Sequence, residues 1–320
     1  MKPAPFLFRQ LFAIALFVVL PTGHSWGAKP GMPEGWSDGY VYANGARLHY
    51  YRAVPASEKP DLLMVHGVTD IGLCWATLAK ELQGDYNIVM LDARSHGLSD
   101  PIKATDDGDT LIKDVVEAAK GLGLKKPILI GHSMGAHTVM HLGAKYPDLA
   151  RAIIMLDPFL SRPGAKGPKG KPGKEGEADA KAVQNRLSVR MNADPKTLVE
   201  QNNYRFEDLV ATGRRQFPKW DDLDVRYWAL SKKQYHGAYS DEAWQVMSSL
   251  MQTGDSLSKI KVPALILKAD ASPEQRKADA AAVKGNDKIK IAHVDDAGHN
   301  LHQDQRKATL NHLTRFLSEL

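Results

Sequence analysis

The chain has 320 residues, of which 43% are hydrophobic and 25% charged, and its formal net charge is +5. This length allows one large α/β domain or two small ones, and the composition is that of an ordinary globular protein. The net charge falls from +5 to +3 without Lys2 and Arg9, so the charge balance gives no case for nucleic-acid binding.

Residues 1–27 have the pattern of a secretory signal. A basic start precedes a short apolar core at 11–20, and the small residues Ser25 and Gly27 predict cleavage before Ala28. An uncleaved membrane anchor is the alternative, but an apolar run of about ten residues is short of the roughly 20 that span a bilayer. We therefore expect an exported, periplasmic or extracellular protein without stable membrane insertion after signal removal.

Cys74 is the single cysteine of the chain. No intramolecular disulfide can form, so the fold must depend on its hydrophobic core. Next to Trp75, this cysteine is predicted to pack as a small apolar residue and not to act as a nucleophile.

The first half of the chain alternates strand and helix patterns. Residues 39–54 predict a hairpin around Asn44-Gly45. Apolar runs then predict strands, and amphipathic stretches predict helices, in the order strand 61–67, helix 75–82, strand 86–97, helix 109–123, strand 126–133, helix 134–147 and strand 150–158. Strands that are apolar on both faces and alternate with helices predict a mostly parallel, doubly wound α/β sheet.

The second half resumes this pattern after an interruption. Strands are predicted at 262–270 and 288–300 and helices near 273–284 and within 303–319. Residues 159–250 show helical periodicity without a convincing strand. The predicted organisation is therefore a core formed by 28–158 and 251–320 and an inserted helical cap at 159–250.

The cap contains a Gly/Lys-rich stretch, 161–180, in which glycine recurs at every third position from 164 to 176. This spacing is also that of a collagen triplet, but five triplets inside a globular chain could not easily recruit two further strands. The stretch is interpreted as a flexible cationic loop.

Ser133 lies between two glycines in the sequence GHSMG, residues 131–135. A strand is predicted before it and a helix after it, which is the context of a nucleophile on a sharp strand-to-helix turn. The hydroxyl would then stand at the carboxyl end of the sheet and at a helix N-terminus, where developing negative charge is favoured.

A serine needs a base, and His299 follows the last predicted strand in the sequence DDAGHN. The competing histidines are less well placed. We expect His132 to point away along the turn, and the others lie within other motifs, strands or helices, at His66, His137, His141, His293 and His302.

The base in turn needs an orienting carboxylate. Asp270 ends the strand ALILKAD and is the preferred candidate, whereas Asp157 ends the strand IIMLD and is the rival. Serine, acid and histidine then follow in the order 133, 270 and 299, as this architecture requires.

Two further stretches complete the predicted site. The backbone amide of Val68, after the strand and His-Gly turn of residues 64–67, can pair with that of Met134 as an oxyanion hole. The polar turn 91–100 is expected to support the site, with structural roles for Asp92, Arg94 and Ser99.

Together, HGVTD, DARSHGLSD, GHSMGA, KAD and AGHN resemble the α/β-hydrolase superfamily, over essentially all of residues 39–319 except the cap. The resemblance is to the capped branch that includes small esterases, haloperoxidase-like enzymes and carbon–carbon bond hydrolases. This chain has Arg94-Ser95-His96-Gly97 where the family usually has arginine followed directly by glycine. A serine at 133 disfavours the dehalogenase and epoxide-hydrolase members, which have an aspartate there.

The implied reaction is hydrolysis of a carboxylic ester or related acyl bond through an acyl-enzyme, with no cofactor or metal required. Ten aromatic residues within 158–250 suggest an apolar lid over a medium-sized hydrophobic small-molecule substrate, or alternatively a core of the cap itself. The alternative functions are a non-catalytic binding protein on a hydrolase scaffold, cofactor-free perhydrolysis and carbon–carbon bond hydrolysis.

Overall fold

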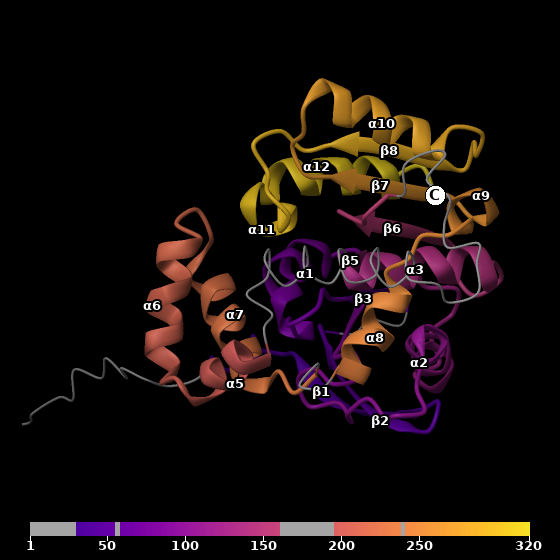
Figure 1. The fold of residues 1–320 in the computed structure, drawn as a ribbon. Helices are drawn as coiled ribbons and strands as arrows, with labels where there is room; N and C mark the ends of the chain where they lie inside the picture. The colour runs from indigo at the N-terminus through magenta and orange to yellow at the C-terminus, as the bar shows by residue number, and fades with distance from the viewer. Residues whose placement is uncertain (1–29, 55–57, 161–194, 238–240) are drawn as a thin grey trace, which may run out of the picture.

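The computed structural model describes residues 30–54, 58–160, 195–237 and 241–320 (Figure 1). The predicted signal segment 1–27 lies outside the described residues, and so does the glycine-rich stretch 161–180. Within the described ranges, none of the helices combines the length and the apolar character needed to cross a membrane.

The fold is built on one eight-stranded sheet with the strand order β1-β2-β4-β3-β5-β6-β7-β8. β2 pairs antiparallel with both β1 and β4, and the other neighbouring strands pair in parallel. The strands are β1 Ser37–Ala43, β2 Ala46–Arg52, β3 Asp61–Val65, β4 Asn87–Leu91, β5 Ile128–His132, β6 Ala152–Leu156, β7 Ala264–Lys268 and β8 Ile289–His293. The predicted α/β class with a mostly parallel sheet is confirmed.

The hairpin of β1 and β2 forms where the Asn-Gly pair predicts it. Asn44 and Gly45 both have positive φ angles, 48° and 73°, which a two-residue hairpin turn of the I′ type requires. Ala43 pairs with Ala46 directly across this turn.

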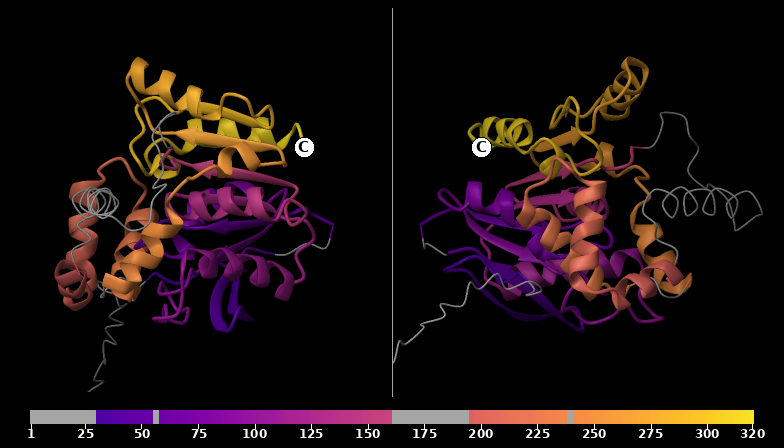
Figure 2. Two further views of the ribbon diagram at one scale, coloured as in Figure 1. Left: turned by 45° about the vertical axis from the view of Figure 1, so that its right-hand side comes forward. Right: turned by 90° about the vertical axis from the view of Figure 1, so that its left-hand side faces the viewer.

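Alternate residues of the buried strands face two separate hydrophobic clusters, as β3 illustrates. Leu63 and Val65 pack into one cluster, and Leu62 and Met64 into the other. Helices therefore cover both faces of the sheet (Figures 1 and 2).

The two clusters draw on different helices. The first cluster includes residues of α2 Gly108–Gly121, α3 Met134–Lys145, α8 Asp241–Leu250 and α9 Ser256–Lys259. The second includes residues of η1 Gly72–Trp75, α1 Ala76–Leu82, α6 Phe206–Gln216, α7 Asp222–Gln234, α11 Leu301–Asp304 and α12 Arg306–Leu317.

The described residues between β6 and β7 form helices and no strand. They comprise α5 Pro195–Asn203 together with α6, α7, α8 and α9. Figure 1 shows α5, α6 and α7 beside the sheet, whereas α8 lies against α2. The last crossover, α10 Pro273–Val283, connects β7 to β8. The carboxyl ends of β3, β5, β6, β7 and β8 consequently meet at one edge, where ligands of open α/β sheets bind.

Candidate active site

Ser133 occupies a sharp turn between β5 and α3. Its backbone angles, φ 51° and ψ −112°, lie in a region that a residue with a Cβ adopts only under strain, and such strain is common at functional sites. Close packing on both sides explains the flanking glycines. A Cβ on Gly131 would lie 2.0 Å from the Gly135 carbonyl oxygen, and a Cβ on Gly135 would lie 2.0 Å from the Val65 carbonyl oxygen.

The Ser133 hydroxyl is buried and makes no hydrogen bond with the described residues. The serine and His299 therefore share no hydrogen bond in this structure. The backbone amide of Ser133 donates to the Leu156 carbonyl at 3.0 Å, which places the serine beside the end of β6. Asp157 is the next residue along that strand end.

His299 pairs with Asp157. Its Nδ1 lies 2.6 Å from Asp157 Oδ2, and because a carboxylate accepts, Nδ1 carries the proton and Nε2 is left as the basic nitrogen. The prediction that Asp270 orients the histidine is wrong, and the rival acid takes this place. The residues that come together are in chain order Ser133, Asp157 and His299.

The Asp270 carboxylate has its partners away from His299. Strand β7 ends two residues earlier, at Lys268, whereas Asp157 follows the last residue of β6 directly. The exposed Asp270 carboxylate instead accepts from the Asp296 amide at 3.1 Å and from Arg276 at 2.6 Å, and these contacts lower its pKa. It therefore stabilises the loop before His299 from outside the site.

A lysine side chain contacts the other oxygen of the Asp157 carboxylate. Lys268 Nζ lies 2.6 Å from Asp157 Oδ1, and the Ala269 amide donates to the same oxygen at 3.2 Å. Burial alone would raise the pKa of Asp157, but the His299 hydrogen bond and the Lys268 charge hold it well below its ordinary value. Asp157 is consequently ionised at every pH at which the protein is expected to work.

His132 does not point away from the site, which corrects a second expectation. Its Nε2 lies 2.9 Å from the His299 carbonyl oxygen and must donate to it, and the two imidazole rings are 4.8 Å apart. The residue before Ser133 thus holds the backbone of His299. The sequence motif carried no signal for this contact, which depends on how the last loop folds back over β5.

The other histidines near the site are held neutral. Burial lowers the pKa of His137 and of His302 to about 3 each, and lowers that of His132 well below its ordinary value. His141 and His293 have structural partners elsewhere, in Ser256 and the Leu250 carbonyl and in Asp279. In the part of the chain that the structure describes, no group of three or more His, Cys, Asp or Glu side chains could hold a metal ion.

The segments of the predicted oxyanion hole lie against each other. Gly135, in the first turn of α3, contacts the carbonyls at the end of β3, and the side chains of Val68 and Met134 share one buried cluster. This packing brings the two backbone segments to the same edge of the sheet as Ser133, which is compatible with a shared oxyanion site.

The residue after Val68 is held by contacts that the sequence did not reveal. The Thr69 amide donates to His96 Nε2 at 3.2 Å. Lys232, buried on cap helix α7, donates to the Thr69 carbonyl at 3.0 Å and to its hydroxyl at 2.7 Å, and lies 3.8 Å from Asp70. The cap and the 91–100 turn therefore both fix the loop that carries the Val68 amide.

Comparison with known proteins identifies the family of the chain. Residues 62–312, most of the chain, match the alpha/beta hydrolase family. The chain belongs to the alpha/beta hydrolase family.

Its relatives within that family include proteins with different named activities. The chain is 26% identical over 270 residues to N-formylmaleamate deformylase of Pseudomonas putida, covering 83% of this chain and 91% of that protein. It is 31% identical to epoxide hydrolase 1 of Caenorhabditis elegans over 139 residues, which is 43% of this chain but only 34% of the epoxide hydrolase. The crystal structure of E-2-(acetamidomethylene)succinate hydrolase superposes with a TM-score of 0.68 at 20% identity, over 88% of this chain and 99% of that one, and shows the shared fold.

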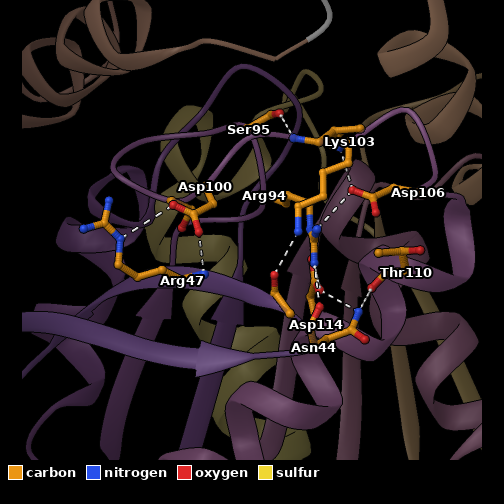
Figure 3. Close-up of polar contacts among 12 residues, drawn as sticks. Asn44, Arg47, Arg94, Ser95, Asp100, Lys103, Asp106, Thr110 and Asp114 are labelled. Carbon is orange, nitrogen blue, oxygen red and sulfur yellow. Dashed lines mark hydrogen bonds and ion pairs between the residues drawn. The ribbon is translucent and has the colours of Figure 1, made fainter.

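The 91–100 turn of this alpha/beta hydrolase is organised around the buried Arg94 (Figure 3). Its guanidinium makes a bidentate contact with Asp114 on α2, at 2.8 and 2.7 Å, and a third hydrogen bond to Asp106 at 3.0 Å. Asp92 accepts from the amides of Gly72 and Leu98. These contacts are structural, as the sequence led us to expect for Arg94 and Asp92, and they hold the backbone that carries His96.

Replacement of Arg94 by methionine is expected to lower the free energy of unfolding by about 3–5 kcal/mol, because it leaves the buried Asp114 carboxylate without its cationic partner and with only the Asn44 amide as a side-chain donor. Urea denaturation followed by circular dichroism measures this loss. Arg47→Met is the matched control, since Arg47 pairs with Asp100 at the exposed surface and should cost at most about 1 kcal/mol. Equal losses in the two variants would show that the Arg94 network does not support the turn.

Most of the described aromatics in the predicted cap pack into the two hydrophobic clusters that cover the faces of the sheet. Phe206, Trp220, Tyr227, Trp228, Tyr235 and Trp244 are buried, and Tyr204 is exposed. Tyr239 lies outside the described residues. Phe159 is different, because its ring stacks 6.1 Å from that of His299 at an interplanar angle of 17°. Of the described aromatics in the expected lid, Phe159 thus provides an apolar surface beside the proposed base.

Proposed function

We propose that this alpha/beta hydrolase is a serine hydrolase in which Ser133 is the nucleophile, His299 the general base and Asp157 the orienting acid. One observation carries the proposal: the strained turn that holds Ser133 lies at the same sheet edge as the His299–Asp157 pair. A serine in such a turn, followed later in the chain by an acid and a histidine, has the order expected for this architecture.

In the proposed reaction, Ser133 Oγ attacks the substrate carbonyl carbon while His299 Nε2 takes the hydroxyl proton. The amides of Val68 and Met134 stabilise the oxyanion of the tetrahedral intermediate. His299 then gives its proton to the leaving group as the acyl-enzyme forms. A water molecule, deprotonated by the same histidine, attacks the acyl carbon and releases the acid product and the free serine.

For the substrate, we propose a carboxylic ester with a medium-sized hydrophobic part, for which Phe159 offers an apolar surface next to His299. An acyl bond to nitrogen is the second candidate. It is supported by the deformylase of Pseudomonas putida, which aligns with 83% of this chain and whose name describes removal of a formyl group from an amide.

Epoxide hydrolysis is disfavoured, although several relatives carry that name. Those relatives match segments of this chain, and the resemblance to the superfamily places an aspartate in epoxide hydrolases where this chain has Ser133.

We further propose that the protein is exported. A mature chain beginning near Ala28 in its native host would support export, and one that retains Met1 would contradict it.

Turnover of matched substrates tests the proposed function. The purified protein is given nitrophenyl esters of acetic, butyric and octanoic acid and the nitroanilides of the same acids. We expect saturable hydrolysis of the esters, fastest for the longer acyl chains, and slower hydrolysis of the anilides. Faster anilide turnover would favour the C–N candidate, and failure to turn over either series would favour a non-catalytic binding protein.

A further inference from the structure

Lys268 is a largely but not fully buried cation that the proposed triad does not use. It is the last residue of β7, its side chain is 13% exposed, and its ammonium group also donates to the Pro158 carbonyl at 2.6 Å. The sequence predicted that the end of β7 supplies the triad acid, Asp270. In the structure, the end of β7 supplies Lys268, which contacts Asp157 at the end of the neighbouring strand β6.

The contact is fixed by the backbones of two paired strands. Leu156 of β6 pairs with Leu267 of β7, and the Asp157 amide donates to the Leu267 carbonyl at 2.7 Å. Asp157 itself has a φ angle of 46°, a left-handed conformation that aspartate adopts more readily than most residues. An ion pair that is desolvated and held in this way interacts more strongly than an exposed pair on flexible side chains.

The two oxygens of Asp157 have different partners. Oδ2 accepts from His299, and Oδ1 accepts from Lys268 and from the Ala269 amide. A cation on Oδ1 has two consequences. It prevents the carboxylate from rotating away from the imidazole, and it offsets part of the negative potential that stabilises protonated His299.

The other ionisable groups around His299 compete little with this effect. His132, His137 and His302 are neutral, because burial lowers the pKa of each. Burial raises the pKa of Asp70, which faces the site from the loop after β3, and Lys232 lies 3.8 Å from its carboxylate. Lys268 is therefore the cation most directly coupled, through Asp157, to the base.

Building on the proposed function, we infer that Lys268 is a positioning residue of the active site, which orients the Asp157 carboxylate toward His299 and limits the basicity of that histidine. The acid side of the kcat/KM profile reports the protonation of the base in the free enzyme. Without the positive charge, protonated His299 is stabilised. The acid limb of the profile, where kcat/KM falls as the base becomes protonated, must therefore move to higher pH.

The test compares the pH dependence of kcat/KM for four proteins: the wild type, Lys268→Gln, Lys268→Arg and Lys290→Met. The glutamine can keep the hydrogen bond to the Pro158 carbonyl while it removes the charge, and we expect its acid limb to move up by about one pH unit, the scale of one nearby partly buried charge. The arginine keeps the charge and should leave the limb near that of the wild type. Lys290 is the control, because it lies on β8 and pairs with Glu319 at the exposed surface.

An unmoved limb in Lys268→Gln, or an equal shift in Lys268→Arg, would overturn the inference. Should a variant be too slow to assay, NMR titration of the His299 ring in the Ser133→Ala background gives the same comparison without turnover. Failure of the proposed function has a different signature, namely Ser133→Ala with wild-type activity. The two outcomes can therefore be told apart.

Discussion

Replacement of Ser133 by alanine is expected to reduce kcat for ester hydrolysis by about 10⁶, with the fold intact. Removal of the nucleophile of a serine hydrolase has an effect of this size, because the acyl-enzyme can no longer form. The substitution removes one buried hydroxyl that has no hydrogen-bond partner among the described residues, so the melting temperature should change little. Stopped-assay kinetics and thermal melting followed by circular dichroism measure the two quantities.

Ser258→Ala is the matched control for this variant. Ser258 is exposed on α9 and its hydroxyl donates to the Asp255 carbonyl at 2.7 Å, away from the site. A fluorophosphonate should add its mass to Ser133 in the wild type and in the control variant, and should fail to label Ser133→Ala. Labelling at a different serine, or retained activity in Ser133→Ala, would contradict the proposed nucleophile.

The second large effect is expected at Asp157. Asp157→Asn should lower kcat by about 10⁴, because the amide no longer stabilises the imidazolium and can favour the wrong tautomer of His299. Asp270→Asn should change kcat by much less, since its carboxylate contacts Arg276 and the Asp296 amide and not the histidine. Steady-state kinetics of the two variants, with circular dichroism as a check on folding, make the comparison.

The Asp157 substitution also leaves the Lys268 charge without its partner, so part of any loss could come from altered packing. The double variant Asp157→Asn/Lys268→Met removes both charges and controls for this. Recovery of most of the activity in the double variant would mean that the isolated lysine, and not the missing carboxylate, is the cause. Greater damage from Asp270→Asn than from Asp157→Asn would contradict the structural assignment of the acid.

Local patterns in the sequence were sufficient to predict most of the fold. The Asn44-Gly45 turn has the positive φ angles that its residue types favour, and the apolar runs became buried strands. Ser133 could be singled out as well, because the glycines around it are required by backbone contacts that are local to the turn and to the strand beside it. Such features depend on residues close in sequence or on the period of one element.

The partners of His299 come from distant segments of the chain, and the predictions made for them from the sequence were wrong. Both Asp157 and Asp270 follow predicted strands. Only the packed structure shows that the Asp157 carboxylate accepts from His299, whereas that of Asp270 accepts from Arg276 and the Asp296 amide. His132 likewise reaches the His299 carbonyl because the last loop returns over β5, 167 residues further along the chain.

Hydrophobic periodicity and the glycines at close backbone approaches are therefore enough to predict the α/β class and the turn that presents Ser133. The pairing of Asp157 with His299 and with Lys268 became evident only from the packed structure. A hydrogen bond or an ion pair requires its two groups to be placed to within a few tenths of an ångström. The order of strands in the sequence specifies at which edge of the sheet a residue lies. The precise positions of two side chains at that edge are set only when the paired strands and the returning loops have packed.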